Sequence, residues 1–156
     1  MIDGPGSCLV VGDTPKGKLV TQVIDSLSEY SATQMDEEAL RSTGNSSDLT
    51  EYNLLVEVTG NSEIAKQSIQ KARQGSVILL LGNRYEKFNL TNKAVLEKTV
   101  VKSETDSNLN LGDTIDTVSN LEVNSILDGT YDMEEFNTAR RLAMESEQFP
   151  VISVES

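Results

Sequence analysis

Residues 7–17 read SCLVVGDTPKG, and this stretch decides the fold class. The run from Cys8 to Val11 suits a buried strand, and Gly12 ends it. A helical pattern begins at Lys16, because apolar residues follow at three- and four-residue spacing. These residues are Leu19, Val20, Val23, Ile24 and Leu27. The stretch therefore predicts a strand, a tight turn and a helix in direct succession.

The same alternation continues along the chain. The predicted strands lie at 8–11, 30–35, 53–60, 76–83, 99–101 and 150–156. The predicted helices lie at 16–30, 36–40, 61–75, 113–129 and 132–147. Asp36 and Asp113 are expected to cap two of these helices, and Asn61 or Ser62 a third. The expected inward residues of the last two helices are Ile115, Val118, Leu121, Leu127, Met133, Phe136, Ala139 and Ala143.

Strands that alternate with helices predict right-handed crossovers and a parallel sheet. We therefore expect a doubly wound α/β fold with helices on both faces of the sheet, as one domain over residues 1–156. Ligands of such sheets bind beyond the carboxyl ends of the strands, where the strand order reverses. The loops that carry Gly12, Gly60 and Gly82 should therefore meet at one crevice.

Composition excludes several classes of function. The chain has 13 basic and 25 acidic residues, so its net charge of −12 repels a nucleic-acid backbone. It has no histidine, the most frequent general base and the usual zinc ligand. We therefore expect no nucleic-acid partner and no metal, and we name no catalytic residue.

The single cysteine and the hydropathy pattern bear on the compartment. Cys8 lies inside the first apolar run, so a buried, unreactive role is expected. No apolar stretch approaches the ~20 residues of a membrane span, and the start does not resemble a secretory signal. We expect a cytoplasmic protein that does not enter a membrane.

Four stretches together resemble the nucleotide-binding domain of the medium-chain, alcohol-dehydrogenase-like dehydrogenases and reductases. They are PGSCLVVGDTPKGKLVTQV, NLLVEVTGNSEIAKQSIQKARQGSVILLLG, AVLEKTVVKS and DMEEFNTARRLAMESEQFPVISVE. The second is the most specific, since two strands, a helix and three glycines fall in register. The resemblance extends from Pro5 to Glu155 and implies a Rossmann-type domain that binds NAD or NADP.

The chain departs from that family in its catalytic half. In the family, a preceding β-rich domain of the GroES type holds the substrate and any catalytic zinc, and nothing here resembles it. The resemblance therefore implies an oxidoreductase-like domain that needs a catalytic domain or protein partner, and no zinc is expected in this chain. It also implies a homodimer contact beside the strand at 76–83.

The turn departs from the family's G-x-G-x-x-G fingerprint at one position. Gly12 and Gly17 supply the first and third glycines, whereas Thr14 replaces the middle one and narrows the approach to a pyrophosphate. The resemblance implies that the pyrophosphate rests on Thr14, Pro15, Lys16 and Gly17. The alternative is a strand-to-helix turn that binds nothing, with Lys16 and Lys18 as solvated lysines.

The remaining candidate residues follow from the same comparison. An acid about 20 residues after the turn should hold the adenosine ribose, and Asp36 lies at that distance, although Gln34 or Met35 could occupy the key position. Asp36 could equally be only a helix cap. Gly60 and Gly82 would leave room for the nicotinamide half, and Glu57 is expected to be structural.

Two functions remain open from the sequence. The first is an NAD(P)-binding domain that is not catalytic by itself. The second is a degenerate Rossmann domain that has lost its cofactor and serves as a protein-interaction or scaffold module. Thr14 and the ribose position discriminate between them.

Overall fold

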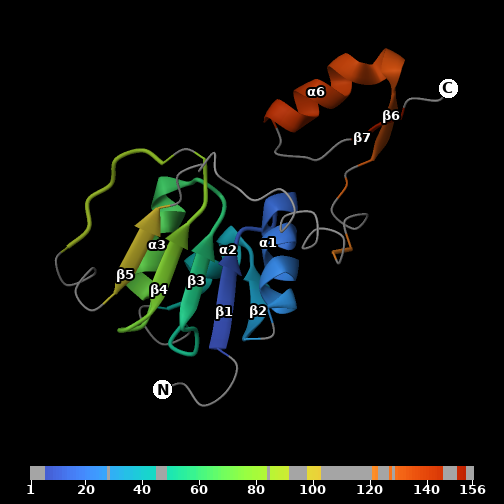
Figure 1. Cartoon of the computed structure of the whole chain (residues 1–156). Helices are drawn as coiled ribbons and strands as arrows, with labels where there is room; N and C mark the ends of the chain where they lie inside the picture. Colours follow the sequence, from blue (N-terminus) through green and yellow to red (C-terminus); the bar gives the residue numbers. More distant parts are fainter. Residues whose placement is uncertain are drawn as a thin grey trace.

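The computed structural model describes residues 6–27, 29–44, 49–83, 85–91, 98–102, 121–122, 127, 129–145 and 151–153. Its centre is a five-stranded sheet in the order β2-β1-β3-β4-β5 (Figure 1). The strands are β1 (Gly6–Val11), β2 (Tyr30–Met35), β3 (Leu54–Glu57), β4 (Val77–Leu80) and β5 (Thr99–Lys102). Every neighbouring pair is parallel, as the alternation of elements predicts.

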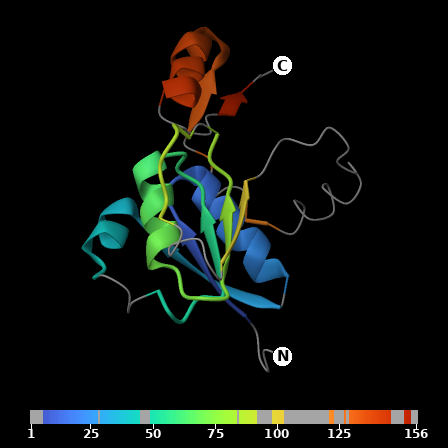
Figure 2. The ribbon, with the colours of Figure 1, turned by 90° about the vertical axis from the view of Figure 1, so that its left-hand side faces the viewer.

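Helices cover both faces of this sheet, so the predicted doubly wound fold is confirmed. They are α1 (Pro15–Ser26), α2 (Glu37–Ser42) and α3 (Ser62–Lys71). Figure 2 shows α1 on one face and α2 and α3 on the other. Side chains cap the first turn of each helix: Thr14 caps α1, Asp36 caps α2 and Asn61 caps α3. Such caps accept hydrogen bonds from amides that a helix start leaves unpaired.

The core forms two clusters, because successive strand residues point to opposite faces of the sheet. Cys8 and Val10 pack with Ile24 of α1, whereas Leu9 and Val11 pack on the α2 and α3 face with Ile64. β1 and β3 are nearly all buried, as expected of a parallel sheet covered on both faces. Cys8 is fully buried, as predicted.

The strand order places a topological switch point between β1 and β3. The chain passes from β1 to β2 on one side and later returns to β3 on the other side. The connections leaving β1 and β3 therefore diverge at the carboxyl ends of the strands, which opens the position where such sheets bind ligands. The predicted crevice lies at this edge.

The C-terminal residues form a separate small unit. β6 (Thr130–Asp132) and β7 (Val151–Ser153) pair in parallel, and η2 (Met133–Glu135) and α6 (Phe136–Glu145) connect them. Figures 1 and 2 show this unit beyond the carboxyl ends of the large sheet. The terminal strand was predicted, but β6 was not, and β7 pairs with β6 in the two-stranded sheet.

Two predictions of inward residues are wrong. Ala139 is buried as expected, whereas Phe136 is 48% exposed, because α6 packs on a sheet of only two strands that covers one side of the helix. Leu127 is 36% exposed. The helix predicted at 113–129 falls mostly outside the described residues. None of the described helices is long and apolar enough to cross a bilayer.

Candidate functional site

The turn after β1 brings its two glycines into direct contact. Gly12 has a φ of 127°, which residues with a side chain rarely adopt. A Cβ on Gly17 would lie 2.1 Å from the carbonyl oxygen of Gly12, so α1 can approach β1 this closely only with a glycine there. The predicted tight turn is present, and the structure adds a close packing of α1 against the end of β1 at Gly17.

Thr14 stands at the position of the middle glycine of the fingerprint and caps the start of α1. Its Oγ1 accepts a hydrogen bond of 3.1 Å from the amide of Gly17. Pro15 occupies the first helical position and has no amide hydrogen to offer. One of the amides that a phosphate would use at this helix start therefore already has a partner.

Lys16 spans the crevice from α1 to the loop after β4. Its Nζ donates to the carbonyl oxygen of Leu81 and, at 3.4 Å, to Oδ1 of Asn83. The ammonium group therefore lies between two of the three predicted loops. A phosphate at the start of α1 would compete with these oxygens for the same cation.

The predicted meeting of the three glycine loops is confirmed. The amide of Val58 donates to the carbonyl of Val11 at 3.1 Å, and the amide of Leu81 donates to that of Glu57 at 2.8 Å. These bonds extend the strand pairing into the loops. A Cβ on Gly82 would lie 2.2 Å from the Cα of Gly60, so these two backbones touch.

A buried carboxylate fixes the last two loops. Glu57 is completely buried, and its Oε1 accepts hydrogen bonds from the amide (2.7 Å) and the hydroxyl of Thr59. Its Oε2 accepts a hydrogen bond from the hydroxyl of Tyr85. The same hydroxyl oxygen accepts a hydrogen bond of 2.7 Å from the amide of Gly82. Burial, and then the neighbouring Glu57 carboxylate, raise the pKa of Tyr85. Glu57 is thus structural, as predicted.

The residues at the end of β2 have separate tasks. Oδ1 of Asp36 accepts the amide of Ala39 at 2.7 Å, so this carboxylate caps α2. Nε2 of Gln34 donates to the carbonyl of Gly12 at 2.8 Å. Gln34 therefore braces the turn from the side, and the exposed Asp36 stands at the edge of the sheet.

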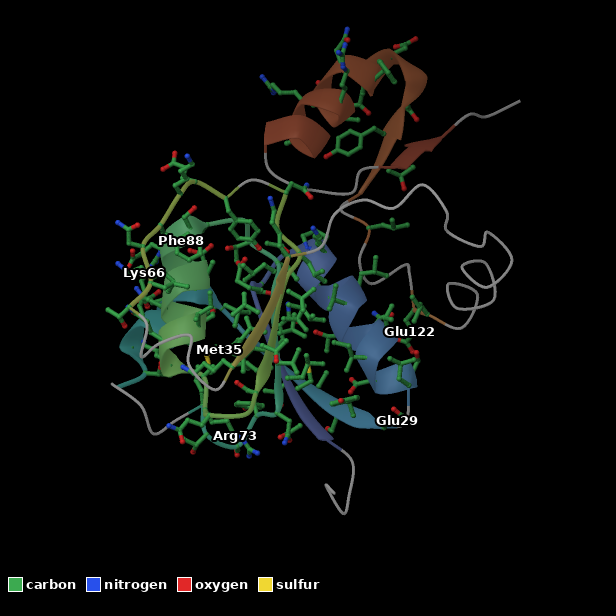
Figure 3. All side chains as sticks on the ribbon, turned by 60° about the vertical axis from the view of Figure 1, so that its left-hand side comes forward. Glu29, Met35, Lys66, Arg73, Phe88 and Glu122 are labelled. Atoms are coloured by element: carbon green, nitrogen blue, oxygen red, sulfur yellow. The ribbon has the colours of Figure 1, made fainter. Side chains whose placement is uncertain are left out.

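A groove of about 820 Å³ opens beside these residues. It lies between the starts of α2 and α3 and the segment at 86–89. Its lining is Glu37, Thr59, Gly60, Asn61, Ser62, Glu63, Lys66, Glu86, Lys87, Phe88 and Asn89. Figure 3 shows Lys66 and Phe88 on the outer side of α3 and the neighbouring segment. Of the predicted residues, only Gly60 lines this groove.

The sequence analysis did not identify the residues that contact Glu57 and α3 at this site. Tyr85 contacts Glu57 across 28 positions, and the polar segment at 86–89 contacts the start of α3, where the hydroxyl of Ser62 donates to the carbonyl of Glu86 at 3.1 Å. No local pattern identifies such contacts. The only available signal was the charge of Glu57 in an apolar strand, which required a polar partner somewhere in the fold.

Comparison with known proteins supports the architecture. No family model and no curated protein matches the sequence. Among solved structures, glucose dehydrogenase from Haloferax mediterranei, in complex with NADP, Zn and gluconolactone, superposes with a TM-score of 0.73 at 19% identity. The alignment covers 100% of this chain and 53% of that one. The chain has a Rossmann-type fold.

Two further structures agree with this assignment. Alcohol dehydrogenase from Thermus sp. ATN1 gives a TM-score of 0.71 at 18% identity, over 97% of this chain and 52% of that chain. Acetophenone reductase from Geotrichum candidum, in complex with NAD, gives 0.68 at 14%, over 98% and 50%. The chain thus spans about half the length of the dehydrogenases and reductases whose fold it shares.

The site holds no cluster typical of a metal centre within the residues that the structure describes. No three histidine, cysteine, aspartate or glutamate residues come together there in a way that could hold a metal ion. The arrangement at the edge of the sheet consists instead of glycine contacts, one helix start, lysines and carboxylates.

Proposed function

We propose that the chain binds NAD or NADP at the carboxyl edge of its sheet and acts as the cofactor domain of a medium-chain dehydrogenase or reductase. One observation carries this proposal: the contact of Gly12 with Gly17 builds a strand–turn–helix at the switch point of the sheet. Backbone amides and the positive end of a helix at this position favour phosphate groups.

The phosphates would be held by the start of α1. Thr14 and Gly17 would offer backbone there, and Lys16 and Lys18 would supply positive charge. The Gly17 amide and the Lys16 ammonium have internal partners, which the phosphates must displace or share. We therefore expect weaker binding than a turn with three glycines would give.

The adenosine ribose would lie at the end of β2, where Asp36 is the acid in reach. A carboxylate there accepts hydrogen bonds from the ribose hydroxyls and repels a 2′-phosphate. Glu37, the neighbour of Asp36, adds a second negative charge that Arg41 partly neutralises through an ion pair of 3.0 Å. NAD is therefore preferred over NADP in this proposal.

The reaction requires more than this chain. A bound nicotinamide would supply hydride-transfer chemistry, and the protein must then provide a substrate pocket and a route for the proton. Gly60 and Gly82 would bound the nicotinamide half at the edge of the sheet. We assign no catalytic residue, so a catalytic domain or protein partner completes the oxidoreductase.

The experiment that tests the ribose assignment compares two substitutions. Asp36→Ser keeps a residue that caps helices well but removes the carboxylate. The matched control is Glu38→Ser, on the next exposed position of the same helix start. Isothermal titration should show that Asp36→Ser alone lowers the preference for NADH over NADPH by about tenfold, or ~1.4 kcal/mol. Equal ratios in both variants would refute the assignment.

A specific observation also favours the second candidate, a scaffold module without cofactor. Thr14 Oγ1 and the Leu81 carbonyl satisfy the very groups that would hold a phosphate. A domain that had lost its cofactor would be expected to close its crevice in this way. The absence of binding heat on titration with NADH and with NADPH would support this candidate.

The homodimer is a separate proposal, based on the family resemblance. Among the strands that the structure describes, β5 is the last one in the sheet, beside β4, and Val101 on it is 44% exposed. A strand at the edge of a sheet can extend that sheet across two subunits. Light scattering at tens of micromolar protein checks this directly, and the mass of a single chain would contradict it.

A further inference from the structure

A second groove, on the α1 face of the sheet, is apolar throughout. It has a volume of about 330 Å³ and lies between α1 and the strands β3 and β4. Its lining is Leu19, Val20, Val23, Ile24, Leu27, Tyr30, Leu54, Val56, Leu79 and Leu81. Such a surface offers no donors for a phosphate or a sugar, so it suits aliphatic side chains.

The groove matters because α1 leaves much of its own apolar face uncovered. Leu27, at the end of α1, is 55% exposed. On the opposite face, α3 covers β3 and β4 and buries Ile64 and Ile69 completely. A contiguous apolar surface on a protein of this size normally has an occupant.

The path of the chain indicates which occupant this is. β5 ends at Lys102, next to β4 and on the far side of the groove from α1. The amide of Glu122 donates to Oε1 of Gln22 on α1 at 3.0 Å, and Figure 3 shows Glu122 beside that helix. The groove lies between these two points, because α1 and β4 both line it and β5 is the next strand after β4.

The sequence of the connecting stretch fits the groove. Ile115, Val118 and Leu121 recur at three-residue spacing, which places them on one side of a helical pattern. Leu121 is half-buried, although it directly precedes the exposed Glu122. Aliphatic side chains at this spacing match a groove whose lining is aliphatic apart from Tyr30.

We propose that the apolar residues of the stretch 113–121 dock in the α1 groove and complete the core of the domain on that face. The groove is then an internal packing surface and takes no part in nucleotide binding. Docking would also anchor the C-terminal unit, because this stretch leads into β6. This proposal stands or falls independently of the proposed function.

The test uses the absence of tryptophan from the chain. Val118→Trp introduces a single indole on the docking side, and Asn120→Trp introduces one on the opposite side as the matched control. We expect blue-shifted emission and several-fold weaker quenching by acrylamide for Val118→Trp only. Adding Leu27→Asp, a change at an exposed position of the groove, should abolish both effects.

Each other outcome overturns the proposal. If Val118→Trp folds with an unchanged melting temperature but emits and quenches like Asn120→Trp, the stretch does not dock. If its protection disappears on dilution, a second copy of the chain fills the groove instead. If Leu27→Asp leaves the protection intact, the indole is buried at another site. A melting curve of every variant establishes that it is folded.

Discussion

At the scale of single residues, Thr14 decides how open the phosphate turn is. Its methyl and hydroxyl groups occupy the place of a glycine, and its Oγ1 binds the amide of Gly17. Thr14→Gly frees that amide and lets the backbone approach a pyrophosphate, whereas the lost cap costs only a few tenths of a kcal/mol for glycine.

We therefore predict that Thr14→Gly tightens NADH binding by about tenfold, or ~1.4 kcal/mol. Thr14→Ala is the control, because it removes the hydroxyl but keeps a Cβ at the critical position. Isothermal titration of both variants checks the prediction. No gain for the glycine variant over the alanine variant would show that the side chain does not limit binding.

Cys8 makes stability dependent on pH in the alkaline range. Burial, and then the negative charge of Asp25, raise the pKa of the thiol from 9.0 to about 12. A pKa raised in the folded state gives a contribution that is complete below the unfolded pKa and is lost as pH rises through the folded one. The thiol should thus stabilise the fold fully below pH 9 and progressively less between about 9 and 12.

We expect the free energy of unfolding to fall by at most about 1.4 kcal/mol per pH unit across this range through Cys8. Urea titrations of the wild type and Cys8→Ala at pH 8 and pH 10.5 measure it. All other titratable groups are common to both proteins, so the difference between them isolates the thiol. An identical fall in both would exclude Cys8 as the cause.

At the scale of elements, the end of β3 and the end of β4 are held together by backbone contact. A Cβ on Gly82 would lie 2.2 Å from the Cα and 2.3 Å from the nitrogen of Gly60, so both loops would have to separate. We predict that Gly82→Ala destabilises the protein by about 2 kcal/mol, the usual cost of overpacking.

Gly44→Ala is the matched control for Gly82→Ala. No atom lies within 4 Å of a Cβ at Gly44, so its effect should stay within about 0.5 kcal/mol. Chemical denaturation of both variants gives the comparison. Equal stabilities of the two variants would mean that the loops after β3 and β4 separate at little cost, which would contradict the tight contact between Gly60 and Gly82.

The same elements show what sequence reasoning reaches. β1, α1, β2 and α2 were predictable because apolar spacing, Gly12 and the cap at Asp36 are local signals. The meeting of Gly12, Gly60 and Gly82 followed from the topology of parallel sheets. Local pattern and fold agree on the order and type of these elements, whereas the first helix ends at Ser26 and does not extend to residue 30 as predicted.

The contacts that close the crevice could not be predicted in the same way. Lys16 reaches Leu81 across 65 positions, and Tyr85 reaches Glu57 across 28. Side chains of this length have many rotamers, so only the assembled fold selects one. The prediction that Phe136 faces inward failed for a related reason. The spacing of apolar residues in α6 does not show that the sheet packed against this helix is small.

At the scale of the whole molecule, the described residues combine a five-stranded Rossmann-type sheet with a crevice that the chain's own groups partly fill. Its fold corresponds to about half the length of solved dehydrogenases, two of which are described in complex with NADP and NAD. The net charge of −12 slows the approach of an anionic dinucleotide, and added salt should weaken this long-range repulsion.

The most direct test of the central claim is isothermal titration of NADH into the purified chain, with a thermal melt as an independent readout. We predict saturable binding of one NADH per chain, weaker binding of NADPH, and stabilisation by about 2.7 kcal/mol at a hundred times the Kd. Absence of heat and of any shift in melting temperature with millimolar NADH and NADPH would contradict the claim and leave the scaffold function as the better account.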